Sequence, residues 1–169
     1  MNPVRLARAA DLPRLEMVER SAAALFRGTA MAAFADGPFT PADALQQGLA
    51  EQLLWVAEVD GQVAGFLLAG TGDDAWLHIL ELDVAAPFQR RGLGTALLMT
   101  ARTAAKARNA PMLSLNTDRH LPWNAPAYAR FGFQELPPDH QPEWLQRILV
   151  RETMIGLDPA RRVAMGLVP

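Results

Sequence analysis

Residues 89–94, with the sequence QRRGLG, combine two arginines and two glycines directly before an alanine- and leucine-rich stretch. The start of a helix exposes about four backbone N–H groups and the positive end of the helix dipole, so a turn that leads into a helix can bind an anion. Gly92 and Gly94 would let a phosphate approach the main chain, while Arg90 and Arg91 would add charge-assisted hydrogen bonds. The residues therefore predict a pyrophosphate site, although a G-x-G pair by itself is more often only a turn.

Two widespread phosphate-binding loops do not fit these residues. The dinucleotide fingerprint requires a third glycine where Leu97 stands, and a Walker loop requires a Gly-Lys-Ser/Thr sequence that is missing. The phosphate-bearing ligand must therefore be held in another way.

Candidate general bases lie just upstream, in the apolar stretch 75–84. Side chains of a strand alternate between its two faces, which puts Glu81 and Asp83 on one face and His78 on the other unless a bulge breaks the alternation. A carboxylate or an imidazole can take a proton from a reacting group, so we consider Glu81 first and His78 second as a general base. The alternative for each is a hydrogen-bonded polar residue at a sheet surface.

Tyr128 is the only tyrosine, so no neighbouring phenol could replace it. Without further information, a tyrosine is more often a core residue with a hydrogen-bonded tip. The chain has no cysteine, which excludes thiolate nucleophiles, disulfides and zinc–thiolate sites. Its three histidines, His78, His120 and His140, are far apart and lack metal-binding spacing, so we expect no metal.

Composition narrows the classes of partner. The chain has 169 residues, half of them apolar, which suits one domain with its own core. The net charge of -2 supplies no broad basic surface for a nucleic acid. There is no apolar run of about 18 residues, and the N-terminal residues Arg5, Arg8 and Asp11 do not suit a signal peptide. We expect a cytoplasmic, bacterial protein that binds neither nucleic acid nor a membrane.

The elements that must position these residues follow from periodicity and turn signals. Asp11 is expected to cap an amphipathic helix, and Asp60-Gly61 to close a hairpin within residues 53–70. In chain order we expect a strand at 4–10, a helix at 12–26, a loop at 27–40, a helix near 41–52, the hairpin at 53–70, a strand at 75–84, a helix at 92–108, a strand at 112–116, a short helix near 124–131 that closes at Gly132, another strand, a helix around 142–154 and an apolar tail. No linker separates a second domain, so residues 1–169 are expected to form one domain.

QRRGLG, preceded by LELDVAAP and followed by TALL, resembles the acyl-CoA signature of the GNAT superfamily of N-acyltransferases. The expected order of elements also matches the GNAT fold over about residues 3–136, and the tail would add the final strand. The resemblance implies an α/β (α+β) fold: a central mixed, mostly antiparallel twisted sheet of about six to seven strands flanked by about four to five helices.

The resemblance also implies a set of site residues. Main-chain groups of the strand end would pair with pantetheine and help to polarise the thioester carbonyl, at Leu82, Asp83 and Val84. The signature would hold the CoA diphosphate through Gln89, Arg90, Arg91, Gly92, Leu93, Gly94 and Thr95. In NAPAYARFGF, residues 124–133, Asn124 would contact CoA and Tyr128 would face the leaving sulfur. This segment departs from the commoner pattern, because Asn124 is only four residues before Tyr128 and Pro126 lies between them.

These observations predict an acetyl-CoA-dependent N-acetyltransferase. With no cysteine, we expect an amine of a small molecule or of a peptide or protein to attack acetyl-CoA directly in a ternary complex, with Glu81 or His78 as base and Tyr128 as acid. Acetyl-CoA would be the co-substrate, and the resemblance adds a homodimer as an expectation. One alternative is a catalytically inactive GNAT-fold sensor that binds acetyl-CoA, and a third is an interaction domain with no nucleotide ligand.

Overall fold

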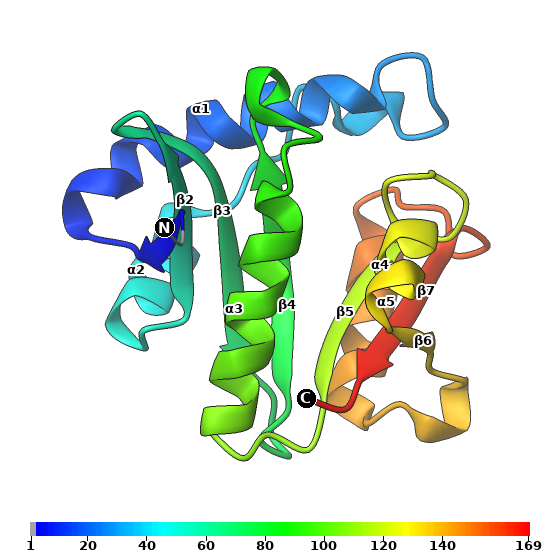
Figure 1. Ribbon diagram of the computed structural model, residues 1–169. Coiled ribbons are helices and arrows are strands. Elements are labelled where there is room, and N and C mark those ends of the chain that lie inside the picture. Colours follow the sequence, from blue (N-terminus) through cyan, green and yellow to red (C-terminus); the bar gives the residue numbers. More distant parts are fainter. Residues whose placement is uncertain (1–2) are drawn as a thin grey trace. The chain divides into compact units, whose positions relative to one another are not determined.

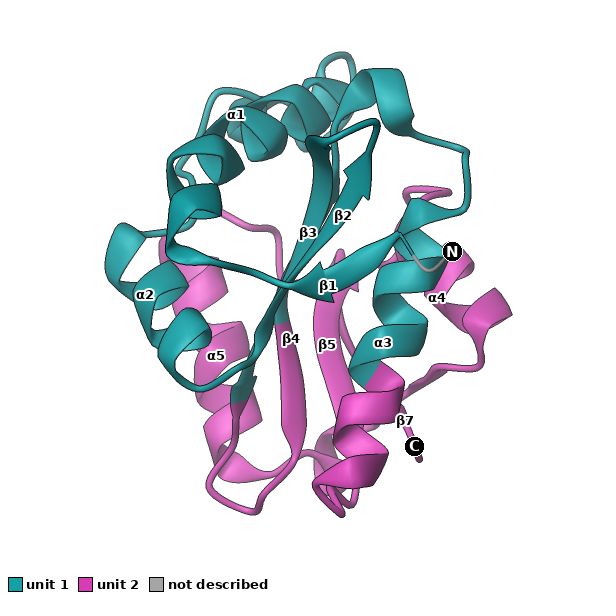
Figure 2. Ribbon diagram, turned by 60° about the vertical axis from the view of Figure 1, so that its left-hand side comes forward, with its two compact units in different colours: residues 1–70, 80–101 teal, residues 71–79, 102–169 magenta. Residues whose placement is uncertain are grey.

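The computed structural model describes residues 3–169, which form two compact units (Figures 1 and 2). Unit 1 comprises residues 1–70 and 80–101, and unit 2 comprises residues 71–79 and 102–169. The described residues contain the helices α1 (Leu12–Ala23), α2 (Ala42–Ala50), α3 (Leu93–Ala107), α4 (Ala125–Phe131) and α5 (Glu143–Met154). Their strands are β1 (Val4–Leu6), β2 (Leu54–Val59), β3 (Gln62–Thr71), β4 (Leu77–Val84), β5 (Leu113–Asp118), β6 (Gln134–Glu135) and β7 (Arg162–Leu167). The strands follow the order β1-β2-β3-β4-β5-β7-β6. The sheet is mostly antiparallel, as the resemblance implies.

In unit 1, β1, β2 and β3 pair antiparallel around a tight hairpin. Val59 pairs with Gln62, and between them Asp60 and Gly61 adopt φ angles of 50° and 74°. Asp and Gly tolerate these positive φ angles, which give the turn the twist of the strands on either side. The predicted hairpin is therefore confirmed.

Helices bury both faces of the β2–β3 ribbon. Leu15 and Val18 of α1 and Leu45 of α2 pack with Val56 and Phe66 in one core cluster. In Figure 1, α3 lies in front of β3 and β4 and runs roughly along them. Because both faces are covered, β2 and β3 carry long runs of buried residues rather than an alternating pattern.

The start of the chain differs from the sequence prediction. The first strand ends at Leu6 instead of residue 10, and α1 ends at Ala23 instead of residue 26. Asp11 precedes α1, but its side chain makes no capping bond there; it accepts the backbone N–H of Arg8 at 2.7 Å and the guanidinium of Arg5 at 2.8 Å. These bonds pull residues 8–11 out of the strand into a tight turn. A second difference is that the predicted loop at 27–40 contains a short 3-10 helix at Ala32–Phe34.

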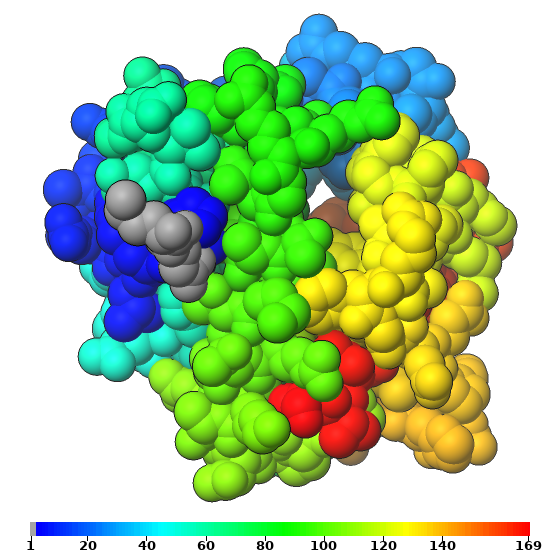
Figure 3. All heavy atoms as spheres, viewed as in Figure 1, coloured from blue at the N-terminus to red at the C-terminus, as the bar shows by residue number. Residues whose placement is uncertain are grey.

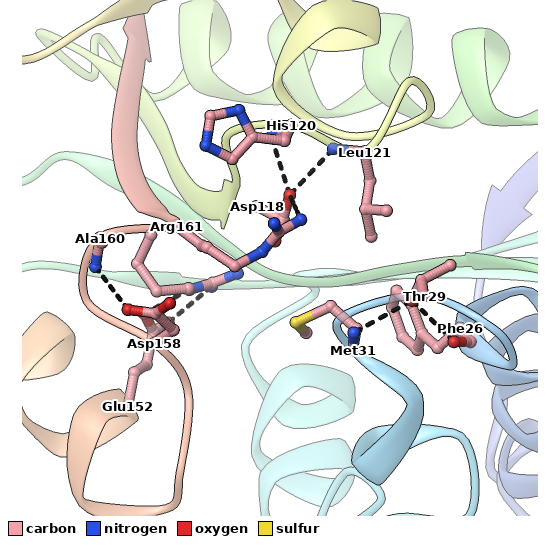
Figure 4. Close-up of polar contacts among 11 residues, drawn as sticks. Phe26, Thr29, Met31, Asp118, His120, Leu121, Glu152, Asp158, Ala160 and Arg161 are labelled. Carbon is pink, nitrogen blue, oxygen red and sulfur yellow. Dashed lines mark hydrogen bonds and ion pairs between the residues drawn. The ribbon is translucent and has the colours of Figure 1, made fainter.

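In unit 2, the first three residues of β4 pair parallel with β5, and β7 pairs antiparallel with β5. The buried Asp118 ends β5 and accepts the backbone N–H groups of His120 and Leu121 at 2.8 and 2.9 Å and the Arg161 guanidinium at 2.8 Å (Figure 4). Burial raises the pKa of Asp118, but these donors outweigh it and leave the pKa below its usual value. The ion pair fixes the chain that leads from β5 towards α4.

Two helices that carry predicted site residues lie within one residue of their expected bounds. α3 buries Leu93, Leu97, Ala101 and Ala105 along one face, as the periodicity predicts. α4 ends at Gly132, whose φ of 114° is the left-handed conformation expected of a glycine helix terminator. Among residues 3–169, none of the helices combines the length and apolarity needed to cross a membrane.

Candidate active site

The end of β4 continues into the 89–95 segment, meaning residues 89–95, which leads into α3. The first helical bond joins the N–H of Ala96 to the carbonyl of Gly92 at 3.0 Å, so the preceding amides have no acceptor inside the helix. A Cβ built on Gly92 or Gly94 meets no described heavy atom within 4 Å. Exposed main-chain N–H groups, open space and the exposed side chains of Arg90 and Arg91 suit a diphosphate. These features fit the CoA diphosphate.

The 89–95 segment is bent by two residues in the left-handed region. Arg90 has a φ of 60° and Gly92 a φ of 81°. A non-glycine residue at positive φ is uncommon and strained, and sequence analysis did not predict this conformation for Arg90. In the space-filling view, the green segment around the start of α3 is exposed on the face shown (Figure 3).

Hydrogen bonds within unit 1 attach this loop to the strand end. The side-chain amide of Gln89 donates to the carbonyl of Val84 at 2.9 Å. The N–H of Ala85 donates to the carbonyl of Ala64 at 2.9 Å, and the N–H of Ala86 donates to the hydroxyl of Ser21 at 2.9 Å. In the structure Gln89 therefore holds the loop against β4, which is a positioning role that the sequence did not predict.

A glycine on β3 allows the end of β4 to lie close to that strand. A Cβ on Gly65 of β3 would lie 2.7 Å from the carbonyl oxygen of Asp83 and 3.1 Å from the Val84 side chain. Real Cβ atoms do not approach a carbonyl oxygen so closely, so only glycine fits here. The main chain expected to meet pantetheine is thus set by Gly65, which sequence analysis missed.

Three acidic side chains of unit 1 form the carboxylate cluster: Glu19 of α1 and Glu81 and Asp83 of β4. One carboxylate oxygen from each lies within 4.8 Å of the other two. The proximity of Glu81 and Asp83 agrees with the predicted alternation along β4. Glu19 was not predicted, although its position four residues after Leu15 on the buried face of α1 marks it as a buried carboxylate. Within the described residues this cluster is also the group of side chains that could hold a metal ion.

The carboxylate cluster disfavours full ionisation. Burial raises the pKa of Asp83 well above its usual value, and the nearby charges of Glu81 and Glu19 raise it further. Burial also raises the pKa of Glu19, against the effect of hydrogen bonds from the N–H and hydroxyl of Thr40, at 2.9 and 3.0 Å. The Oδ2 atom of Asp83 is buried and has no hydrogen-bond partner in residues 3–169. The cluster therefore holds a proton readily, and Oδ2 of Asp83 can accept a further hydrogen bond.

His78 lies in unit 2, in an environment unlike that of the two carboxylates on the same strand. Only 4% of its surface is exposed; Nδ1 lies 2.9 Å from the Ser114 hydroxyl, and the ring meets Trp144 edge to face at 5.4 Å. Burial lowers the pKa of His78 to about 4, so the imidazole is neutral at physiological pH. These contacts are those of a buried structural histidine.

Tyr128 and Asn124 also belong to unit 2, whereas the 89–95 segment and the carboxylate cluster belong to unit 1. Asn124 precedes α4, and its carbonyl accepts the N–H groups of Ala127 and Tyr128 at 2.8 and 3.0 Å. The half-buried ring of Tyr128 packs edge to face against Phe133 at 5.8 Å. The helix start and this aromatic contact fix the direction of the Tyr128 side chain.

Comparison with known proteins bears on the same residues. A sequence model of the acetyltransferase (GNAT) family matches residues 20–133, which include β4, the 89–95 segment and Tyr128. The match extends across both compact units.

Solved structures resemble the chain along nearly its whole length. A Mycobacterium tuberculosis protein in complex with CoA is 19% identical, with 98% of each chain covered and a TM-score of 0.70. Ribosomal-protein-S18-alanine N-acetyltransferase from Escherichia coli is 20% identical, with 99% of this chain and 94% of that chain covered and a TM-score of 0.66. PaiA N-acetyltransferase from Thermoplasma acidophilum in complex with CoA is 15% identical, with 98% of each chain covered and a TM-score of 0.69. At these identities the likeness establishes the fold, which is the GNAT fold expected from the sequence.

Proposed function

The chain belongs to the GNAT family of acetyltransferases, and we propose that it transfers the acetyl group of acetyl-CoA to a primary amine of a small molecule or a peptide. The observation that carries this proposal is the continuity of β4: the strand bears two members of the carboxylate cluster, and its end leads into the 89–95 segment. A base for the amine and a site for the CoA diphosphate thus lie on one stretch of chain. Structural relatives described with bound CoA support acetyl-CoA as the co-substrate.

Acetyl-CoA supplies an activated acetyl group as a thioester. In the proposed reaction a bond forms between the amine nitrogen and the carbonyl carbon, the C–S bond breaks, and the products are an N-acetyl amide, free CoA and one proton from the starting ammonium. The absence of cysteine favours this direct transfer over an acyl-enzyme. Main-chain groups at Leu82–Val84 would orient and polarise the thioester.

Glu81 is the proposed base because it belongs to the carboxylate cluster, where burial and the charges of Glu81 and Glu19 raise the pKa of Asp83, so that the cluster holds a proton readily. The second candidate, His78, is less suited, because a buried imidazole with a pKa of about 4 binds a proton weakly at neutral pH. Tyr128 is the proposed acid for the leaving thiolate. A thiol with a pKa of about 8.5 leaves tolerably without help, so Tyr128 should contribute about 10²-fold.

The test is release of free CoA from acetyl-CoA across a panel of alkylamines, amino acids, polyamines and peptide N-termini, with mass spectrometry of the product. Wild type should acetylate at least one amine, Tyr128→Phe should lower kcat about 10²-fold, and Glu81→Gln should lower kcat most at low pH. Glu135→Gln, an exposed change paired with Arg119, is the matched control. CoA binding without turnover of any amine would favour the sensor, and unchanged kcat in Tyr128→Phe would remove Tyr128 from the mechanism.

A further inference from the structure

One buried carboxylate oxygen of the cluster lacks a hydrogen-bond donor among residues 3–169. Thr40 donates to both oxygens of Glu19, yet the buried Oδ2 of Asp83 has no hydrogen-bond partner within residues 3–169. A buried oxygen without a donor is costly, and such atoms in native proteins often await a ligand. The orphaned atom belongs to a carboxyl group that two other acidic side chains approach.

Positive charge on α1 reaches Glu19 only weakly. Arg20 neighbours Glu19 on α1, where it acts on Glu19 at a distance while Glu16 opposes it. The Arg20 guanidinium bonds to Glu16 at 2.7 Å and lies over the Phe39 ring at 4.1 Å. Arg20 is therefore engaged by Glu16 and Phe39, and a cationic ligand would relieve the repulsion between the carboxyl groups of the cluster.

The chemistry of the donor set favours an ammonium ion over a metal ion. An ammonium group has three N–H donors, so it can donate one hydrogen bond to each of the three carboxyl groups. It can still do so when one of these carboxyl groups is protonated. Mg²⁺ and Ca²⁺ require about six or more oxygen ligands and ionised carboxylates, which a cluster with raised pKa values provides poorly.

We propose that Glu19 and Asp83, together with Glu81, bind the ammonium head of the acceptor, so that the enzyme selects amines that are charged at neutral pH. This inference rests on the proposed transferase function and adds Glu19 as a residue that determines acceptor class. Thr40 is a positioning residue, because its N–H and hydroxyl fix the Glu19 carboxylate.

The first test needs no turnover. n-Butylammonium chloride should raise the melting temperature of wild type above that in sodium chloride of equal ionic strength, and Glu19→Gln and Asp83→Asn should abolish this difference. Both variants should melt higher than wild type without ligand near neutral pH, because each removes a charge from the cluster. Asp36→Asn, an exposed change in the same unit whose carboxylate pairs with Arg27, should behave as wild type.

The second test uses turnover of the best alkylamine and of its hydrazide analogue, whose terminal NH₂ is uncharged at neutral pH. Glu19→Gln should raise KM for the alkylamine about 10- to 100-fold and leave KM for the hydrazide nearly unchanged, because only the charged head loses a charge-assisted bond. Equal changes for both acceptors would overturn the proposal.

The two tests separate the inference from the function on which it rests. Absence of turnover with every amine, while acetyl-CoA still binds, would defeat the transferase assignment without deciding the butylammonium result. No butylammonium effect on wild type, or the same effect in Glu19→Gln and Asp83→Asn, would overturn the ammonium site. Stabilisation by MgCl₂ or CaCl₂ that both variants abolish, without a butylammonium effect, would replace it with a metal site.

Discussion

Two ionisable side chains of β4 show how surroundings decide the chemistry of a residue. Asp83 lies beside Glu81 and Glu19, and burial with these charges raises its pKa. His78 lies against Ser114 and Trp144, and burial alone lowers its pKa to about 4. Asp83 therefore favours binding a proton or a cation, whereas His78 stays neutral within the fold.

At the residue scale, His78 should make the protein acid-sensitive. The pKa of His78 is about 4 in the folded state and near 6.5 in the unfolded state. Between these two values the unfolded state binds a proton at His78 and the folded state does not, so the folded state loses stability as the pH falls. The free energy of unfolding should fall by about 2–3 kcal/mol between about pH 7 and pH 4.5 from this group. His78→Gln should remove that share of the loss, as measured by urea unfolding at both pH values, whereas the exposed His140→Gln should not. An unchanged pH dependence in His78→Gln would contradict the prediction.

At the element scale, the junction of β4 with α3 joins an extended strand to a helix whose first amides face a ligand. Gln89 and the neighbouring backbone bonds attach the loop to the strand, and positive φ angles at Arg90 and Gly92 turn the chain. The helix start thereby exposes N–H groups in a fixed direction, which is the physical basis of an anion site.

Gly94→Val tests this junction better than a change at Gly92. Gly92 has a φ of 81°, so any side chain would strain it, whereas Gly94 lacks a positive φ and a Cβ there meets no described atom within 4 Å. The fold should tolerate Gly94→Val, but the branched side chain should keep the diphosphate from the amides and raise the Kd for CoA at least about 10-fold. Calorimetry should show this, with the exposed Met99→Val on the same helix as control. Unchanged affinity would remove the 89–95 segment from the CoA site.

Gly65 should be needed for the geometry of the strand end. The added methyl of Gly65→Ala would lie 2.7 Å from the carbonyl oxygen of Asp83, so β4 must shift at a cost of about 1–3 kcal/mol. Gly70→Ala on the same strand meets only the tip of Leu80 at 3.4 Å and should cost less. Urea unfolding measures both costs, and weaker CoA binding by Gly65→Ala alone would link the shift to pantetheine. Equal stability of the two variants would show that the close approach at Gly65 is unimportant.

At the scale of the whole molecule, the chemistry-bearing residues are spread from Glu19 to Tyr128 and belong to both compact units. The family match covers residues 20–133 and therefore includes parts of both units. Acetyl-CoA should accordingly stabilise the 169-residue chain.

A ligand that binds only the folded protein at about 100 times its Kd adds about 2.7 kcal/mol, which corresponds to a rise in melting temperature of about 5–10 °C for a chain of this size. Differential scanning fluorimetry with CoA, and with 3′-dephospho-CoA as a matched ligand that keeps the diphosphate, measures this rise. Failure of both to shift the melting curve would revive the interaction domain without a nucleotide ligand.

The order of the elements could be predicted from the sequence because local physics determines it. Asp60-Gly61 favours a tight hairpin, the four-residue spacing of Leu93, Leu97, Ala101 and Ala105 gives α3 its buried face, and Gly132 ends α4. The 89–95 segment could be recognised for the same reason, since a loop and a helix start are contiguous in the chain. Alternation along β4 likewise brought Glu81 and Asp83 together.

Contacts between distant residues were decided only by the tertiary structure. Glu19 joins Glu81 and Asp83 from a helix more than sixty residues away, Gly65 admits the carbonyl of Asp83, and Ser114 with Trp144 encloses His78. Local propensities act over a few residues, whereas burial and the electric field at a carboxylate depend on every chain segment packed around it. The sequence alone therefore determined which segments carry the candidate site residues. Tertiary packing decided which of the acidic and basic side chains can hold a proton.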